Sequence, residues 1–131
     1  MGSTHDSESG ATVLLVDDEA LLRRLLSRIL VEAGFGVVQA ENGAVALETA
    51  RKIDGGLGLV VTDIHMPVMD GIEFAREFRP LRPTVPILFI TGRDLPPTPY
   101  SDPPERELLR KPFQPEAFLA VVSQLVANRV A

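Results

Sequence analysis

The sequence predicts an α/β fold with a parallel sheet, and three observations lead to that prediction. Short runs of branched aliphatic residues alternate with segments whose apolar residues recur at helical spacing. Such alternation is typical of β–α–β units, in which helices cover both faces of a parallel sheet. Apolar residues make up 45% of the chain and aromatic residues only 5%, which favours an aliphatic core. At 131 residues the chain has the length of a single domain.

The first elements follow directly from the residue pattern. The run TVLLV at residues 12–16 is branched and apolar, so it predicts a strand. Leucine and isoleucine residues within 21–30 recur at helical spacing opposite arginines, which predicts a helix that is mostly core-facing. Gly34 ends that helix, and residues 37–38 form a short second strand.

The middle of the chain repeats the alternation. The Asn42–Gly43 pair opens a helix that runs to about Lys52. The run LGLVVT at residues 57–62 predicts a buried strand that ends at Asp63. After a turn at Met-Pro, residues 72–78 predict a short helix.

The last part of the chain completes the fold. The run VPILFI at residues 85–90 predicts a fourth strand, and residues 108–109 predict a short fifth strand. Residues 115–128 form a strongly apolar final helix, which we expect to be mostly core, with some of its surface available to a second copy of the chain or to another protein.

Composition excludes several classes of protein. The absence of cysteine excludes disulfides and thiolate metal sites. The net charge of −5 argues against non-specific nucleic-acid binding, which depends on Lys and Arg. No apolar run approaches the roughly 20 residues of a membrane span, and the N-terminus lacks the apolar segment of a signal peptide. We therefore expect a soluble cytoplasmic protein with a disordered tail at residues 1–10 and a folded domain at 11–131.

Polar residues follow four of the predicted strands. Asp17 and Asp18 follow the first strand, Asp63 the third, Thr91 the fourth and Lys111 the fifth. Because parallel strands place their carboxyl ends at one edge of a sheet, we expect these side chains to converge. Two carboxylates 4 Å apart repel by about 4 kcal/mol at an effective dielectric near 20. Lysine relieves part of that repulsion, and Mg²⁺ would relieve the rest.

This combination of groups supports phosphoryl transfer to a carboxylate. A carboxylate can attack phosphorus and form an aspartyl phosphate. The reaction requires mainly positioning and neutralisation of the phosphoryl oxygens. The metal, the Lys111 ammonium and the Thr91 hydroxyl could supply that neutralisation.

Four sequence strings carry a resemblance to a known family. VLLVDDE, VVTDIHMPVMDG, FITG and LLRKPF resemble, in order and at similar separations, the motifs of response-regulator receiver domains of two-component systems. The match runs from about Thr12 to Asn128. The resemblance implies a three-layer, flavodoxin-like sheet in the order 2-1-3-4-5. It also implies a signalling domain rather than an enzyme, one that at most catalyses its own phosphorylation and dephosphorylation.

The resemblance further assigns roles to individual residues. It implies that Asp63 accepts a phosphoryl group from a sensor histidine kinase or a histidine phosphotransfer protein. Asp18, Asp63 and the backbone carbonyl of His65 would bind Mg²⁺, with Asp17 acting through water. Lys111 would contact the phosphoryl group, and Thr91 would move towards it as the switch. A cis peptide bond between Lys111 and Pro112 is implied as well.

The chain departs from the family after Thr91. Five prolines lie where the family has its fourth helix, and each would cost a helix about 3 kcal/mol. We expect that helix to be shortened, irregular or mobile, as in a receiver subgroup marked by Pro-Phe-x-Phe-Ala-Thr-Gly, to which PILFITG is similar. Leu108 stands where the family usually has Tyr or Phe. Output through the face of the fourth and fifth helices is therefore expected to be altered.

Other interpretations of these residues were weighed. Asp17, Asp18 and Glu19 could serve as the N-cap and acidic first turn of a helix. Asp63 could be a turn residue, and Lys111 a solvated lysine. The His65 ring is expected to be exposed. A phosphatase of the haloacid dehalogenase type needs two aspartates separated by one residue, which Asp17–Asp18 does not provide. A third alternative is a receiver that acts without phosphorylation.

Overall fold

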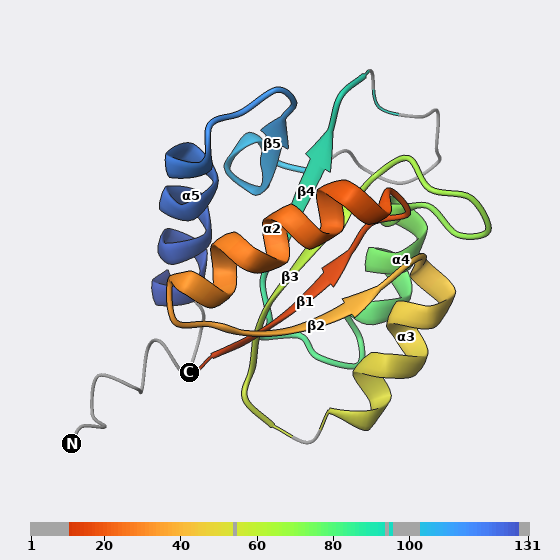
Figure 1. The fold of residues 1–131 in the computed structure, drawn as a ribbon. Helices are drawn as coiled ribbons and strands as arrows, with labels where there is room; N and C mark the ends of the chain where they lie inside the picture. The colour runs from red at the N-terminus through yellow and green to blue at the C-terminus, as the bar shows by residue number, and fades with distance from the viewer. Residues whose placement is uncertain (1–10, 54, 94, 96–102, 129–131) are drawn as a thin grey trace.

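A parallel sheet of five strands, in the order β2-β1-β3-β4-β5, forms the centre of the molecule (Figure 1). The structure is a computed structural model that describes residues 11–53, 55–93, 95 and 103–128. The predicted tail at residues 1–10 lies outside the described residues. The predicted sheet and its strand order are confirmed. The strands are β1 (Thr12–Val16), β2 (Gly36–Ala40), β3 (Leu57–Asp63), β4 (Ile87–Thr91) and β5 (Leu108–Arg110).

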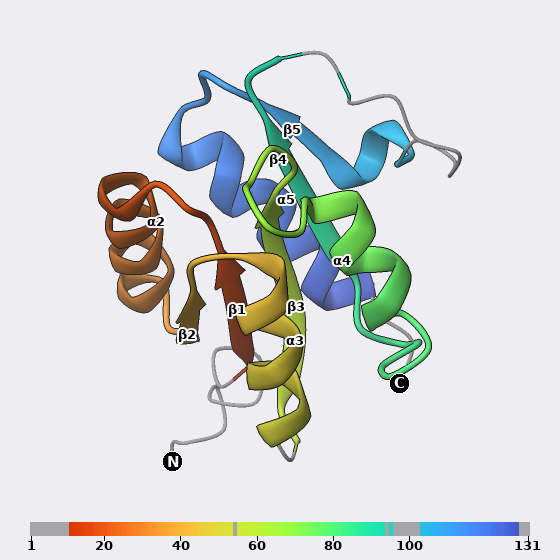
Figure 2. The same ribbon diagram turned by 90° about the vertical axis from the view of Figure 1, so that its right-hand side faces the viewer.

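Helices cover both faces of this sheet (Figure 2). One face is covered by α2 (Ala20–Glu32) and α5 (Pro115–Asn128), and the other by α3 (Gly43–Lys52) and α4 (Gly71–Phe78). The result is the three-layer arrangement that the alternating sequence pattern predicted. Among the described residues, no helix combines the length and apolar character that crossing a bilayer requires.

The core is split into two layers by the alternation of side chains along each strand. In β1, Val13 and Leu15 pack towards α2 and α5, whereas Leu14 and Val16 pack towards α3 and α4. Every residue of β3 is buried, as expected for a central parallel strand. β4 begins at Ile87 rather than at Val85, because Pro86 has no N–H to donate to the sheet.

Capping residues in the sequence determine where α3 and α4 begin and where α2 ends. The Asn42 side chain accepts a hydrogen bond from the Val45 N–H at 2.9 Å and caps α3. Asp70 and Glu73 form a reciprocal capping box at the start of α4. After α2, Gly34 adopts a left-handed conformation with φ of 101°.

The crossover from β4 to β5 lacks an α-helix in its described part. Its only regular element there is one turn of 3-10 helix, η1 (Glu105–Glu107). Residues 94 and 96–102, where much of the irregular helix was expected, lie outside the described residues. Leu108 is partly buried against the core layer beneath α3 and α4.

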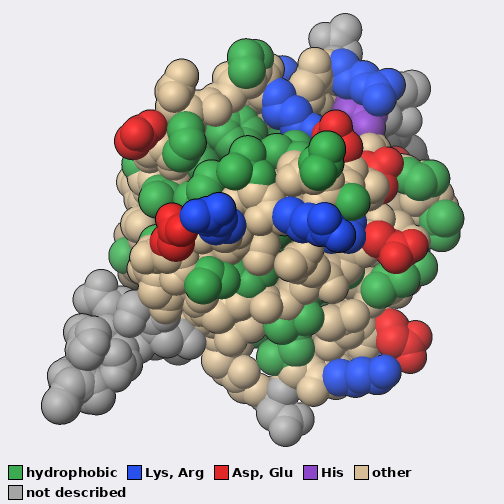
Figure 3. Space-filling view, in the orientation of Figure 1, with side chains coloured by type: hydrophobic (Ala, Val, Ile, Leu, Met, Phe, Trp, Pro, Cys, Tyr) green, Lys and Arg blue, Asp and Glu red, His purple; other side chains and the backbone are tan. Residues whose placement is uncertain are grey.

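The apolar stripe of α2 is less completely buried than the sequence suggested. Leu26 and Leu30 are buried, but Leu21 is 80% exposed and Leu25 54%. Leu21 and Leu25 lie about 100° around the helix from the stripe that faces the sheet, so no strand reaches them. Figure 3 shows green apolar side chains between blue basic ones on this face. In contrast, the apolar residues of α5 pack against the core, as expected.

Candidate functional site

Three carboxylates meet at the carboxyl ends of β1 and β3. Asp17 is 1% exposed and Asp63 is 6% exposed, whereas Asp18 faces solvent. One carboxylate oxygen from each residue can be chosen so that all three lie within 4.8 Å of one another. The predicted convergence of these aspartates is therefore borne out by the geometry.

Burial makes the charged form of two of these carboxylates unfavourable. Desolvation raises the pKa of Asp17 from 3.8 to about 6, and the charge of Asp63 adds to this shift. The Glu19 N–H donates to Asp17 Oδ1 at 2.8 Å and opposes the shift. Burial likewise raises the pKa of Asp63, although Lys111 and backbone N–H groups counteract it. The site therefore favours a ligand that brings positive charge.

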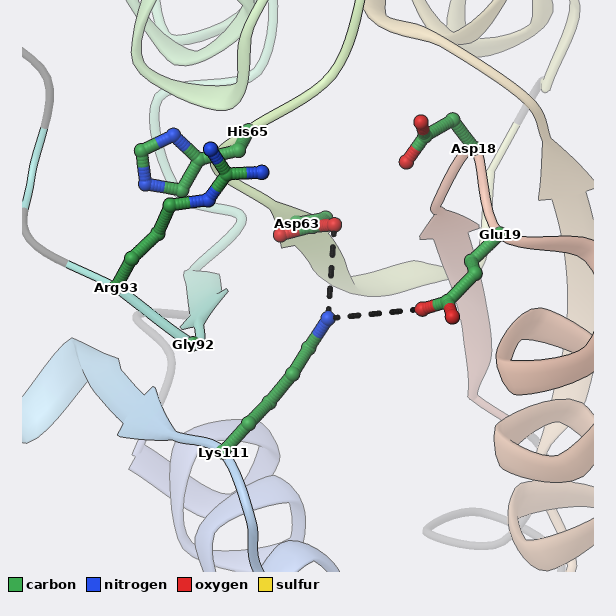
Figure 4. Close-up of a pocket in the computed structure, with 7 residues that line it drawn as sticks. All are labelled: Asp18, Glu19, Asp63, His65, Gly92, Arg93 and Lys111. Carbon is green, nitrogen blue, oxygen red and sulfur yellow. Dashed lines mark ion pairs between the residues drawn. The ribbon is translucent and has the colours of Figure 1, made fainter.

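Lys111 approaches these acids from the end of β5 (Figure 4). Its Nζ lies 3.7 Å from Asp63 Oδ2 and 4.0 Å from Glu19 Oε1. The Lys111 side chain is 27% exposed, so it is not the freely solvated lysine of the alternative interpretation. The Lys111–Pro112 peptide bond is cis, as the resemblance implied.

Thr91 ends β4 and is fully buried. Its hydroxyl donates a hydrogen bond to the Arg93 carbonyl at 2.8 Å and accepts one from the Arg93 N–H at 3.2 Å. Both bonds join the hydroxyl to the backbone of the following loop rather than to Asp63 or Lys111. The Thr91 carbonyl separately accepts a hydrogen bond from the Lys111 N–H at 2.8 Å. Thr91 is therefore beside the acids but bonded away from them.

These groups line a pocket of about 320 Å³ at the carboxyl edge of the sheet. Asp63 lies at its centre in Figure 4, with Asp18 and Glu19 on one side and Arg93 and His65 on the other. The pocket is formed by Asp18, Glu19, Asp63, His65, Gly92, Arg93 and Lys111. It is open to solvent, so a phosphoryl group carried by another protein could enter.

The His65 side chain differs from its expected exposed state. The residue is only partly exposed, and its Nε2 is buried without a hydrogen bond to any described residue. The ring lies beside the Arg93 side chain (Figure 4), and both side chains line the pocket. The polar His65 ring therefore forms a wall of the pocket.

Gly71 fixes the distance between α4 and the end of β3. A Cβ atom at this position would lie 2.4 Å from the Asp63 carbonyl oxygen and 3.0 Å from Ile64 Cα. Its N–H also donates to the Ile64 carbonyl at 2.8 Å. Only glycine permits this contact, which holds α4 against the Asp63 backbone.

The sequence argument overlooked one member of the pocket. Glu19 was interpreted only as a capping residue, and it does occupy the N-cap position of α2. Its side chain makes no capping hydrogen bond, however, and reaches Lys111 instead. Its place directly after two aspartates at a strand end was the available signal. The remaining predicted residues all lie in or beside the pocket.

Comparison with known proteins places this geometry in a family. Residues 13–123 match the family described as Response regulator receiver domain. The chain is 42% identical to the response regulator receiver protein CpdR of Brucella abortus, over 77% of this chain and 84% of that protein. It is 39% identical to the sensor kinase CckA of the same organism, over 66% of this chain but only 9% of that protein.

A solved structure shows the same fold. The response regulator protein TrrA of Thermotoga maritima, in complex with Mg²⁺–BeF, superposes with a TM-score of 0.72 at 29% identity. The match covers 88% of this chain and 98% of that one. The family match extends over most of the chain and includes all four strand ends that build the pocket. The chain belongs to the response regulator receiver domain family of two-component signalling systems.

Proposed function

We propose that this receiver domain, spanning residues 11–131, accepts a phosphoryl group on Asp63 and switches conformation to control a partner protein. The observation that carries the proposal is the position of Asp63. Its carboxylate lies in an open pocket, 3.7 Å from the Lys111 ammonium and beside two further carboxylates. A nucleophile, a cation for the phosphoryl oxygens and a cluster of metal-ligating oxygens are thus in one place.

The acidic cluster fits Mg²⁺. Hard divalent cations prefer oxygen ligands, and burial, which raises the pKa values of Asp17 and Asp63, makes their negative charge unfavourable without a cation. Asp18, Asp63 and the His65 backbone carbonyl would bind the ion, with Asp17 acting through water. The ion would supply positive charge to the phosphoryl oxygens. That the related TrrA was solved with Mg²⁺–BeF supports this assignment.

The chemical step uses the residues of the chain in distinct roles. An Asp63 carboxylate oxygen forms a bond to phosphorus while the bond from phosphorus to the donor's imidazole nitrogen breaks, and that nitrogen keeps the electron pair. The Lys111 ammonium holds a phosphoryl oxygen and balances its charge. Thr91 binds another phosphoryl oxygen only after its hydroxyl releases the Arg93 carbonyl.

The donor would be a sensor histidine kinase or a histidine phosphotransfer protein. A protein-bound phosphohistidine supplies the leaving nitrogen that this step requires. Kinases of this kind take their phosphoryl group from ATP, so a cytoplasmic location of this protein is part of the proposal. A second copy of the chain or a downstream protein bound at the α5 face would receive the switch.

Intact mass measurement tests the proposal directly. The protein is incubated with acetyl phosphate and Mg²⁺, and we expect a mass gain of one phosphoryl group. Asp63→Asn should abolish the gain, whereas Glu48→Gln, an exposed acid on α3, should leave it unchanged. Omitting Mg²⁺ or adding EDTA should suppress it.

Other outcomes would identify a different function. Turnover of added phosphate esters without a stable adduct would favour a phosphatase. The absence of any adduct, with the fold shown to be intact, would favour a receiver that acts without phosphorylation. An adduct that persists in Asp63→Asn would place the acceptor elsewhere.

A further inference from the structure

A second concave surface lies at the opposite end of the sheet from Asp63. This groove, which we call the amino-end groove, has a volume of about 510 Å³, compared with about 320 Å³ for the Asp63 pocket. Three segments form it: residues 79–87 from the end of α4 to the start of β4, residues 104–107 at η1, and the end of α5. None of its lining residues belongs to the Asp63 pocket.

In the part of the crossover that the structure describes, the 3-10 turn η1 is the regular element that lines the groove. Pro83, Pro86 and Pro104 line it. Proline fixes its own φ and lacks an N–H, so these parts of the lining have little conformational freedom to lose. A surface that is already ordered binds with a smaller entropic cost.

The floor of the groove is apolar. Val85 and Leu125 are partly buried and Ile87 is 1% exposed, and all three line the groove. They come from different segments, so an apolar side chain seated here would contact both β4 and α5. An apolar floor of this size suits one or two aliphatic side chains rather than a charged group.

The charges around this floor are mainly positive. Arg79 Nη2 lies 3.4 Å from Glu107 Oε1, and the Arg79 guanidinium lies over the Phe89 ring at 5.9 Å from its centroid. Arg106 is exposed and forms no ion pair with another described residue. The lining of the groove therefore carries two guanidinium groups and one carboxylate, although the net charge of the whole chain is −5.

We infer that the amino-end groove is a docking site for an acidic, extended segment of a partner protein. Charge complementarity selects the occupant: a carboxylate would pair with Arg106, and a neighbouring aliphatic side chain would lie on Val85 and Leu125. The groove is open to solvent rather than enclosed, which suits a polypeptide segment more than a small molecule.

The site goes beyond the proposed phosphoacceptor function and is independent of Asp63. The strands nevertheless link the two regions. β4 runs from Ile87 in the groove to Thr91, and β5 runs from beside Glu107 towards Lys111. A partner bound at the amino-end groove would therefore contact the first residue of β4 and the residue that directly precedes β5.

Backbone amide NMR of the ¹⁵N-labelled protein tests this inference. The probe is an N-acetylated, C-amidated peptide of alternating leucine and aspartate, titrated at low ionic strength. We expect saturable shifts of the amides of Thr84, Val85 and Ile87 and of residues 106–107 and 125–128, and none at residues 17–19. The analogue with asparagine in place of aspartate should bind about tenfold more weakly, the loss of one charge-assisted contact.

Two charge-reversal variants complete the test. Arg106→Glu should weaken the acidic peptide about tenfold or more. Arg24→Glu, which makes the same charge change on exposed α2, should leave the affinity unchanged. Absence of saturable groove shifts, equal binding of the asparagine peptide, or equal effects of the two variants would each overturn the inference. Concentration-dependent shifts at the groove without peptide would also overturn it, since the occupant would then be a second copy.

Discussion

The carboxyl ends of β1 and β3 and the carboxyl ends of β4 and β5 face each other across one pocket, but they are held in different ways. The acid half, Asp17, Asp18 and Asp63, includes two buried carboxylates with elevated pKa values at the ends of β1 and β3. The β4–β5 half, Thr91, Arg93 and Lys111, is held by two local hydrogen bonds and one flexible lysine stem.

From this difference we expect the two halves of the pocket to have different roles. The acid half cannot move without disturbing the core, so its unfavourable negative charge persists until a cation binds. The β4–β5 half can move, because Thr91 has only to exchange two hydrogen bonds with the Arg93 backbone. We expect the unfavourable electrostatic energy to lie in the acid half and the conformational change to occur in the β4–β5 half.

The largest expected effect comes from removing the Lys111 ammonium, which lies 3.7 Å from Asp63 Oδ2 and so links the β4–β5 half to the acid half. Lys111→Gln should slow phosphorylation by acetyl phosphate by about two orders of magnitude, because the phosphoryl oxygens lose a fixed positive charge. The rate of adduct formation is measured by intact mass. Lys52→Gln, at the far end of α3, serves as the control. An unchanged rate in Lys111→Gln would show that the β4–β5 half has no part in the chemistry.

The second prediction concerns how the buried Asp17 carboxylate of the acid half affects the free energy of unfolding. Because the folded pKa of Asp17 is raised, its charge costs stability, and this cost grows as pH rises from about 3.8 through about 6. Without metal at pH 7, Asp17→Asn should therefore raise the free energy of unfolding by about 1–2 kcal/mol, after allowance for solvent screening. Asparagine still accepts the Glu19 N–H, so that contact is kept.

Urea unfolding at several pH values measures this gain. It should disappear below pH 4, where the unfolded carboxyl is protonated too. Saturating Mg²⁺ should reverse the order of stability, since the wild-type carboxylate then has a cation to bind. A variant that is less stable than wild type at pH 7 without metal would contradict the account of the acid half.

The third prediction concerns Thr91 in the β4–β5 half. Thr91→Val preserves the shape of the buried side chain but removes both hydrogen bonds to Arg93, and should cost about 1 kcal/mol of stability. The adduct should still form, because the nucleophile and lysine remain. Amide NMR with and without BeF₃⁻ and Mg²⁺ should show weaker shifts in β4 and β5 than in wild type. Shifts of wild-type size would mean that Thr91 is not the moving part.

The smallest expected effect lies in the loop after β3. Val68 has a positive φ of 72° and is 81% exposed, a conformation that branched residues rarely adopt. Val68→Gly should relieve the strain and stabilise the protein by about 0.5 kcal/mol, net of the entropy that glycine loses on folding. Val68→Ala, which keeps a Cβ atom, should gain less. Thermal unfolding compares the two.

Most of the pocket could be predicted because its members follow strands. Once parallel strands are expected, Asp17, Asp63, Thr91 and Lys111 must share an edge. The loop details could not be predicted in this way. The bonds from Thr91 to Arg93 and the buried His65 Nε2 depend on how short loops fold against each other, which no periodic pattern encodes. The exposure of Leu21 likewise depends on which side of α2 packs against the sheet.

The glycine at the start of α4 has a consequence for how the protein tolerates mutation. A single methyl group at Gly71 would collide with the Asp63 backbone at 2.4 Å, and backbone atoms cannot turn aside as a flexible side chain would. A change of one codon base could therefore displace Asp63 while every carboxylate, hydroxyl and ammonium group of the pocket remains in the sequence. A search for inactive receivers that inspects only the reacting residues would count such a variant as intact.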